Sequence, residues 1–398
     1  LVAVVPDRLD GATLHGFDAR LQLLGGLRLL EDEVVTGTLT FDHDGIVAVD
    51  TGLSHLPTAI NVEGDYVTPG IVEMHTDNME KHFVPRPGVF WPNGLAAALA
   101  HDAQMAAAGV TTVYDSICAG SVFGQKDYRR EIFPQVIRAI EEGIHANAFR
   151  IDHKVHIRCE LTGDELVDDV SPFADNPLVC LVSLMDHTPG KRQWRNLDHL
   201  KRYNIGSGEK TESQHDEDVA IRMDVVPKNM ERNWPLIVEM FGSRGVPLAT
   251  HDDTTEDDVD AGVRSGAVIS EFPTTVVAAR EAKRRGLATI AGAPNVVRGG
   301  SHSGGVAAAE LATLGLLDVL SSDYVPASLL QAVLKLNTDH GIAFPDAMAM
   351  VTWKVADMVG LKDRGHLKQG LRADILRFRV AGATPIVRGL WSNGRVAF

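Results

Sequence analysis

The sequence has few cysteines and no long apolar run. Its three cysteines, Cys118, Cys159 and Cys180, form no C-x-x-C pair and are odd in number, which argues against a disulfide framework and against a cysteine-ligated zinc site. Such cysteine usage fits a reducing cytoplasm. The longest apolar candidate, residues 178–185, has the length of a strand and falls far below the roughly 18 residues that a membrane-spanning helix needs. We therefore expect a soluble cytoplasmic protein with no membrane partner.

Basic residues are also fewer than acidic residues. Lysine and arginine total 38 against 53 aspartates and glutamates, which gives a net charge of −15 at pH 7. A field of this sign repels nucleic acid and anionic membranes, so neither is expected as a partner. Residues 1–10 lack the basic region and the long apolar core of a secretory signal, which again predicts a cytoplasmic location.

The middle of the chain, residues 67–360, alternates short apolar runs with longer amphipathic stretches. This alternation is typical of βα units around a parallel sheet. Eight strands are predicted, at 71–75, 111–117, 155–161, 178–187, 247–252, 267–272, 289–295 and 319–324. Eight is the strand number of a TIM-like (β/α)8 barrel, so the predicted fold class is α/β with a hydrolase barrel over residues 67–360.

Both termini have a different pattern. Residues 1–66 and 361–398 contain short apolar runs separated by glycine, aspartate and the Asn393–Gly394 turn. We expect these two segments to form one small composite β-sandwich domain beside the barrel.

Side chains that bind metals stand at the carboxyl ends of the predicted strands, where barrel enzymes place their active sites. His75 and Asp77 are two residues apart in an extended segment and therefore point the same way. A lone strand-end histidine is more often a hydrogen-bonded residue than a ligand, but six convergent side chains predict a site for one or two divalent ions. Their nitrogen and oxygen atoms suit zinc, manganese and iron. The predicted ligands are His75, Asp77, Glu160, His187, His251 and Asp323.

Cationic and hydroxyl side chains gather near the same strand ends and could hold a triphosphate. The glycine-rich segment 298–304 precedes a predicted helix at 306–316, an arrangement that turns backbone amides toward an anion. The alternatives are a tight turn in which Ser301 or Ser303 caps that helix, and a solvated loop after His187. The predicted substrate contacts are Lys81, His82, Arg86, Arg158, Lys191, Arg192, Arg298, Ser301 and His302.

Several motifs carry a resemblance to a known family. The segment VTPGIV at 67–72 leads into HTDN at 75–78, and it is followed by SLMDHTPG at 183–190, GAPNVVRGGSHSG at 292–304, SSDY at 321–324 and GLRAD at 370–374. Over essentially its whole length the chain resembles the amidohydrolase superfamily of metal-dependent barrel enzymes. Within it, the motifs are similar to those of the α-D-ribose 1-methylphosphonate 5-triphosphate diphosphatases of the carbon–phosphorus lyase pathway.

The resemblance implies roles for individual residues. The first strand of the superfamily usually supplies H-x-H, and here Asp77 takes the second position. Glu160 takes the bridging place that a carboxylated lysine fills in many relatives. Asp323, as general base toward the water, and His302 are the expected catalytic residues. The superfamily usually has its two single histidine ligands on strands five and six, whereas the predicted strands put His187 and His251 on four and five.

The expected function is metal-dependent release of pyrophosphate from a phosphorylated ribose, by a protein that could form a homodimer. One alternative is a hydrolase of C–N bonds, such as a deacetylase or cyclic amidase, which would require few cationic residues near the metal. A noncatalytic scaffold is a further alternative, and the complete ligand set argues against it.

Overall fold

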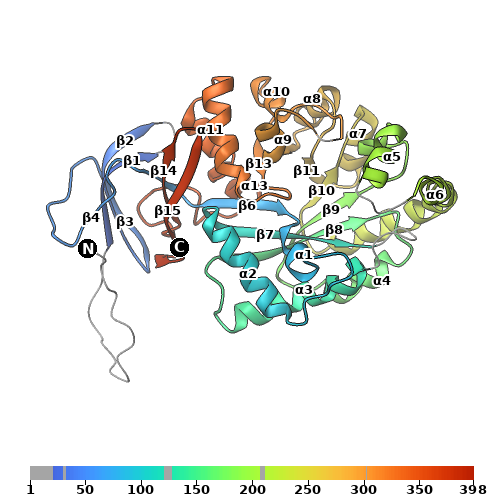
Figure 1. Ribbon diagram of the computed structural model, residues 1–398, viewed down its shortest axis with the longest axis horizontal. Helices are drawn as coiled ribbons and strands as arrows, with labels where there is room; N and C mark the ends of the chain where they lie inside the picture. Colours follow the sequence, from blue (N-terminus) through green and yellow to red (C-terminus); the bar gives the residue numbers. More distant parts are fainter. Residues whose placement is uncertain (1–20, 30–32, 121–127, 207–210, 302) are drawn as a thin grey trace.

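The computed structural model describes residues 21–29, 33–120, 128–206, 211–301 and 303–398. These residues form a barrel with surrounding helices and a separate sheet at one end (Figure 1). No helix among the described residues is both long and apolar enough to cross a membrane.

The barrel has the eight parallel strands that the sequence predicts. They are hydrogen-bonded in chain order, and an isolated bridge between Thr76 and Asp323 brings the first strand beside the segment that follows the last. The (β/α)8 prediction is confirmed. The strands are β6 (Ile71–Thr76), β7 (Val110–Ala119), β8 (Asp152–Glu160), β9 (Val179–Met185), β10 (Leu248–His251), β11 (Ala267–Glu271), β12 (Ala288–Gly292) and β13 (Val319–Ser321).

Burial explains the near-continuous apolar runs of these strands. Every residue of β6 and β7 is buried, because one face of each strand points into the barrel and the other lies under helices. The barrel interior holds apolar side chains such as Met74, Leu181 and Ile269. This interior fixes the positions of the strand ends, and with them the polar residues that follow.

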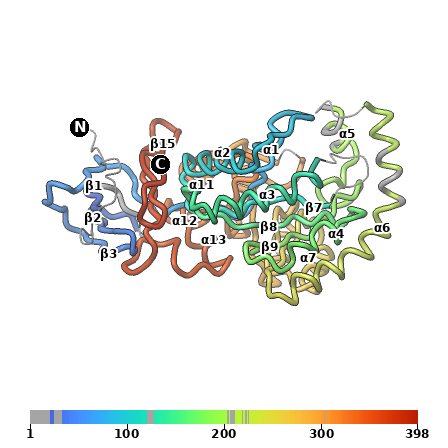
Figure 2. Tube along the Cα trace, turned by 90° about the horizontal axis from the view of Figure 1, so that it is seen from below, coloured from blue at the N-terminus to red at the C-terminus, as the bar shows by residue number. Residues whose placement is uncertain are grey.

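Helices separate most of the strands and cover the outside of the barrel (Figures 1 and 2). The longest, α6, begins with a capping box between Thr211 and Gln214 and lies at the end of the molecule away from the separate sheet. The helices are α1 (Asn78–Phe83), α2 (Gly94–Ala107), α3 (Tyr128–His145), α4 (Leu166–Val170), α5 (Leu197–Gly206), α6 (Glu212–Gly242), α7 (Glu256–Arg264), α8 (Val276–Arg284), α9 (Ala293–Arg298), α10 (Ala308–Thr313), α11 (Ser328–His340), α12 (Phe344–Ala349) and α13 (Trp353–Met358).

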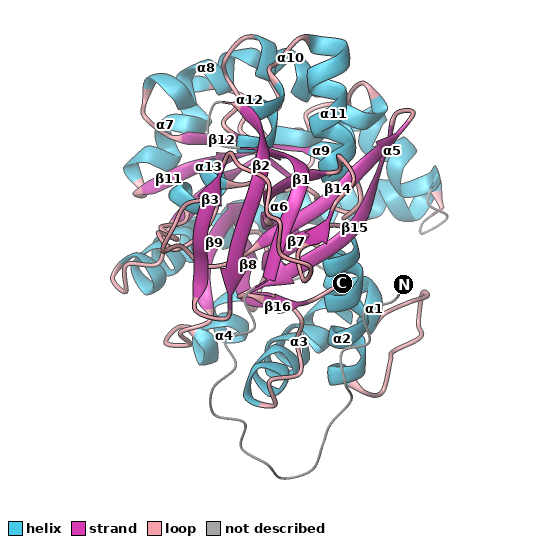
Figure 3. Ribbon diagram, turned by 90° about the vertical axis from the view of Figure 1, so that its left-hand side faces the viewer, coloured by secondary structure: helices cyan, strands magenta, loops and turns pink. Residues whose placement is uncertain are grey.

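Both termini contribute to the separate sheet, as predicted (Figure 3). Its strands follow a single hydrogen-bonded path, β16-β15-β14-β5-β1-β2-β3, with β4 paired to β1, whereas the predicted sandwich has two sheets. The strands are β1 (Leu21–Leu29), β2 (Val34–Asp42), β3 (Gly45–Asp50), β4 (Ile60–Asn61), β5 (Tyr66–Pro69), β14 (Ile375–Ala381), β15 (Thr384–Ser392) and β16 (Arg395–Val396).

One glycine connects this composite sheet to the barrel. Gly70 stands between β5 and β6, and its amide donates to the carbonyl of Asp374 over 2.9 Å. A Cβ atom at this position would lie 2.3 Å from Oγ1 of Thr111, so only glycine fits without displacing β7. The composite sheet therefore holds the start of β6, the strand that carries His75.

Candidate metal and phosphate site

The carboxyl ends of the barrel strands surround a cavity of about 860 Å³. All six residues predicted as metal ligands line this cavity. They lie at or just after the ends of β6, β8 and β10, and in the segments that follow β9 and β13. The strand count of the prediction is correct: His187 follows the fourth barrel strand, His251 ends the fifth, and the sixth ends at Glu271.

Glu271 joins two of the histidines. Its Oε1 lies 3.0 Å from Nδ1 of His75 and its Oε2 lies 3.1 Å from Nδ1 of His251. The carboxylate is fully buried, and although burial acts in the opposite direction, the neighbouring histidines and their hydrogen bonds hold its pKa well below the usual range. An ionised Glu271 accepts a hydrogen bond from the Nδ1–H group of each ring, which leaves Nε2 of both rings free for a metal.

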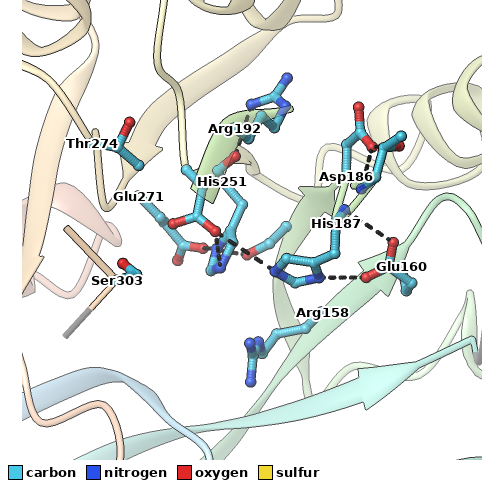
Figure 4. Close-up of polar contacts among 12 residues, drawn as sticks. Arg158, Glu160, Asp186, His187, Arg192, His251, Glu271, Thr274 and Ser303 are labelled. Atoms are coloured by element: carbon cyan, nitrogen blue, oxygen red, sulfur yellow. Dashed lines mark hydrogen bonds and ion pairs between the residues drawn. The ribbon is translucent and has the colours of Figure 1, made fainter. Parts of the chain in front are cut away.

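His187 and His251 face a common carboxylate. Their Nε2 atoms lie 3.6 Å and 3.7 Å from Oδ2 of Asp252, an enclosed oxygen with no hydrogen-bond partner. Nδ1 of His187 contacts Oε2 of Glu160 at 2.5 Å (Figure 4). Burial alone would raise the pKa of Glu160, but the charge and hydrogen bond of His187 lower it to about 2. Glu160 thus orients His187 toward His251 and Asp252.

Asp77 and Asp323 lie on another side of the cavity. The amide of Asp77 donates to the carbonyl of Asp323 over 3.1 Å, and the amide of Asp323 donates to the carbonyl of His75 over 3.0 Å. Burial, followed by the charge of Asp77, raises the pKa of Asp323 to about 7. Oδ1 of Asp77 is enclosed and has no hydrogen-bond partner, although Nζ of Lys81 lies 3.5 Å away.

These side chains fit a divalent cation. Two sets of side chains have ligand-type atoms within 4.8 Å of one another, His187 with His251 and Asp252, and His75 with His251 and Glu271. In the second set Glu271 lies at hydrogen-bond distance from both Nδ1 atoms, so it orients the two rings and leaves their Nε2 atoms as the ligands. Oδ1 of Asp77 and Oδ2 of Asp252 are enclosed without a hydrogen-bond partner, which is costly, and coordination to a cation would remove that cost.

Backbone strain concentrates at three residues that line the cavity. Asp252, Phe272 and Asp323 directly follow or lie close after β10, β11 and β13, and they have φ angles of 57°, 53° and 53°. A positive φ is unfavourable for residues other than glycine, and for Phe272 especially. The surrounding structure holds these residues in place, and each turns the chain sharply at the cavity edge.

The predicted substrate contacts divide into two groups. Lys81, Arg158, Arg298 and Ser301 line the cavity. His302 lies outside the described residues. The remaining four do not line this cavity: His82 contacts Gln104, Arg86 pairs with Val89 in a small bridge, Lys191 is exposed, and Arg192 is buried.

Arg192 has a structural role in place of the predicted substrate contact. Its Nη1 donates to the carbonyl of His251 and to Oδ1 of Asp253, both at 2.7 Å, and Nη2 lies 3.8 Å from Asp258. The side chain is buried, and these two carboxylates neutralise its charge. Arg192 therefore supports the strand end that carries His251.

The glycine-rich segment differs from its prediction. The helix that follows it begins at Ala308 and has only six residues, so neither Ser301 nor Ser303 caps it and no long helix end faces the segment. Instead, Ser301 Oγ accepts from the amide of Ser303 over 3.2 Å. Ser301 and Ser303 both line the cavity, with hydroxyls in place of a helix end as the polar groups.

Sequence reasoning missed two residues of the cavity region. Glu271 is the last residue of β11 and stands one residue before the end of the predicted strand 267–272, as His251 does in the predicted strand 247–252, so the rule that identified His251 applies to it equally. No sequence pattern marks Arg129 as a cavity residue, because it lies at the start of α3, where an exposed arginine is expected. The fold brings it to the cavity edge.

A second buried cluster joins α2 to the barrel wall. Nε2 of His101 lies 2.8 Å from Asp115, and Nδ1 of His153 lies 2.7 Å from the other oxygen of Asp115. These are hydrogen-bond lengths, shorter than the spacing of ligand atoms around an ion. Burial alone would lower the pKa of His153, but Asp115 and Asp102 raise it to about 9.

This histidine makes stability depend on pH. Its folded-state pKa of about 9 exceeds the ordinary value of 6.5, so its contribution is complete below pH 6.5 and is lost as the pH rises toward 9. We expect the unfolding free energy to fall by on the order of 3 kcal/mol over this window. Urea unfolding at several pH values would measure it, and His153→Gln should flatten the slope. An equal slope in both proteins would contradict the assignment.

The chain is similar to proteins of known function. It is 40% identical over 372 residues to α-D-ribose 1-methylphosphonate 5-triphosphate diphosphatase of Escherichia coli (strain K12), across 93% of this chain and 98% of that enzyme. No protein-family model matches the chain.

Solved structures share the fold at low sequence identity. N-acetyl-D-glucosamine-6-phosphate deacetylase of Mycobacterium smegmatis is 15% identical with a TM-score of 0.60, covering 95% of this chain and 99% of that one. Dihydropyrimidinase of Brevibacillus agri is 12% identical with a TM-score of 0.54, covering 95% and 94%. The 40% identity to the Escherichia coli enzyme shows that the chain belongs to the α-D-ribose 1-methylphosphonate 5-triphosphate diphosphatase family.

Proposed function

We propose that this protein is a metal-dependent diphosphatase that releases pyrophosphate from α-D-ribose 1-methylphosphonate 5-triphosphate. The observation that carries the proposal is one cavity lined both by a metal-type ligand set and by cationic side chains, Lys81, Arg158 and Arg298 among them. A hydrolase of C–N bonds that acts on an uncharged substrate would not need such charge around its metal. Family membership points to the same substrate.

Zinc is the proposed ion, with manganese and iron suited to the same ligands. His75, His187 and His251 would hold it through Nε2, together with the carboxylates of Asp77 and Asp252. When bound, a divalent ion supplies Lewis-acid activation of water and of a phosphoryl oxygen.

Side chains of the protein accept the proton, neutralise the phosphate charge and orient the ligating histidines. Asp323 accepts the proton of the attacking water, and its raised pKa suits a group that takes up a proton near neutral pH. Lys81 and Arg158 neutralise charge on the phosphates, and Glu271 keeps His75 and His251 in the ligating tautomer. Cytoplasmic location and a homodimer remain part of the proposal.

Metal removal tests the proposal directly. We expect the wild-type protein to release pyrophosphate from the ribosyl triphosphate, to lose this activity on chelation, and to regain it with zinc or manganese. Circular dichroism before and after chelation would check that the fold is retained. Unchanged release after elemental analysis shows no metal would contradict the proposal, and turnover of amides or cyclic imides without pyrophosphate release would select the C–N hydrolase.

A further inference from the structure

Two arginines line the cavity on the side of β7 and β8. Arg158 lies on β8 and Arg129 at the start of α3, and Nη1 of Arg129 lies 3.6 Å from Sγ of Cys118. The positive charge of each guanidinium acts unfavourably on the other, and both act on the Cys118 thiol that lies near them. Two like charges held this close require negative charge nearby.

The carboxylates on that side supply little of it. Oε2 of Glu80 lies 3.7 Å from Nε of Arg129, and Oδ2 of Asp77 lies 4.0 Å from Nη1 of Arg158, both beyond hydrogen-bond length. The Nε atoms of both arginines are enclosed and have no hydrogen-bond partner. Burial raises the pKa of the Cys118 thiol, which keeps it neutral.

The carboxylates around the two arginines have other partners among the described residues. Asp77 belongs to the proposed metal ligands, and Glu160 accepts from Nδ1 of His187. Glu80 accepts from the amide of Cys118. The enclosed Nε–H groups of Arg129 and Arg158 therefore lack an acceptor, and an anion bound in the cavity is the ligand that this arrangement fits.

The opposite side of the cavity is different. Arg298, Ser301 and Ser303 follow β12, the seventh barrel strand, whereas Arg158 lies on the third, so the two groups face each other across the barrel. Arg298 is exposed, and it is accompanied by two hydroxyls. Of the described residues on this side, Arg298 carries the positive charge, which matches the single negative charge of a methylphosphonate ester.

We propose that Arg129 and Arg158 form the subsite for the diphosphate end of the substrate, which departs as pyrophosphate, and that Arg298 with Ser301 and Ser303 holds the phosphonate end. With Lys81, which lines the same cavity, the two arginines offer three cations toward the roughly three negative charges of a terminal diphosphate. This inference rests on the proposed function and assigns the orientation in which the substrate lies.

Binding of inorganic pyrophosphate to the metal-loaded protein tests the subsite without turnover. We expect Arg129→Met to weaken pyrophosphate binding, measured by calorimetry, by about tenfold to a hundredfold, the loss of one or two charge-assisted hydrogen bonds. Binding of methyl methylphosphonate should change little. Arg298→Met should show the reverse pattern, and Arg129→Lys should recover part of the pyrophosphate affinity.

Arg130→Met is the matched control. Arg130 is the next residue of α3, and its Nε donates to Asp169 over 2.8 Å, outside the cavity lining. Its variant should bind pyrophosphate as the wild type does, and thermal unfolding would show whether the Arg129 variants are folded. Pyrophosphate affinity that is unchanged in folded Arg129→Met, or lost in Arg298→Met instead, overturns the proposal. If wild type binds pyrophosphate through Arg129 but does not hydrolyse the ribosyl triphosphate, the proposed function fails and the subsite stands.

Discussion

Asp323→Asn is expected to lower the rate of pyrophosphate release by about 10²- to 10⁴-fold, the usual contribution of a positioned general base. The substitution removes the proton acceptor and keeps the shape of the side chain. It also keeps the backbone conformation, because Asn tolerates the positive φ of 53° found at this position. The loss should therefore appear in kcat with little change in stability.

Metal analysis distinguishes this role from ligation. Asp323 is in neither of the two sets of ligand atoms that lie within 4.8 Å of one another, so we expect the Asn variant to retain its metal. Asp339→Asn, an exposed change on α11, is the control and should be fully active. Full activity of Asp323→Asn would remove it as the base, and loss of metal would make it a ligand instead.

Glu271→Gln is expected to weaken metal binding by about tenfold to a hundredfold. An ionised carboxylate accepts from Nδ1 of both His75 and His251, but an amide has one acceptor oxygen and presents N–H groups on its other side. One histidine must then move its proton to Nε2, which blocks that nitrogen as a ligand.

Titration with zinc, followed by the activity at each concentration, measures this effect. Excess metal should restore part of the activity, because the reacting groups are intact. Glu239→Gln, on the exposed side of α6, is the matched control. Wild-type metal affinity in Glu271→Gln would show that the tautomers of His75 and His251 are fixed by other groups.

The fold was largely predictable because parallel barrel strands are buried on both faces. Their short apolar runs stand out from the amphipathic helices between them, and all eight were predicted. Side-chain alternation also placed His75 and Asp77 on one face of the chain. The single path of the composite sheet was not predictable, because the sequence of a short terminal strand does not indicate which strand it pairs with.

The site was predicted less completely, for physical reasons that differ between residues. Arg192 follows His187 closely in sequence, but the chain turns there and directs the guanidinium to Asp253. Arg129 reaches the cavity only because α3 packs against β7 and β8. Contacts of this kind depend on how helices and strands pack together. The spacing of residues along the sequence does not reveal that packing.

The order of strands in the composite sheet has a consequence for synthesis. Strand β5 lies between β1 and β14, so one of its edges stays open until Ile375 and the residues after it have left the ribosome. That is roughly 300 residues after β5 itself, or on the order of 15–60 s of translation. An unpaired strand edge exposed for so long can pair with another chain. Truncated chains that end before β14 should therefore aggregate. During synthesis, the nascent protein depends on another segment or molecule that covers the open edge of β5 until β14 has been made.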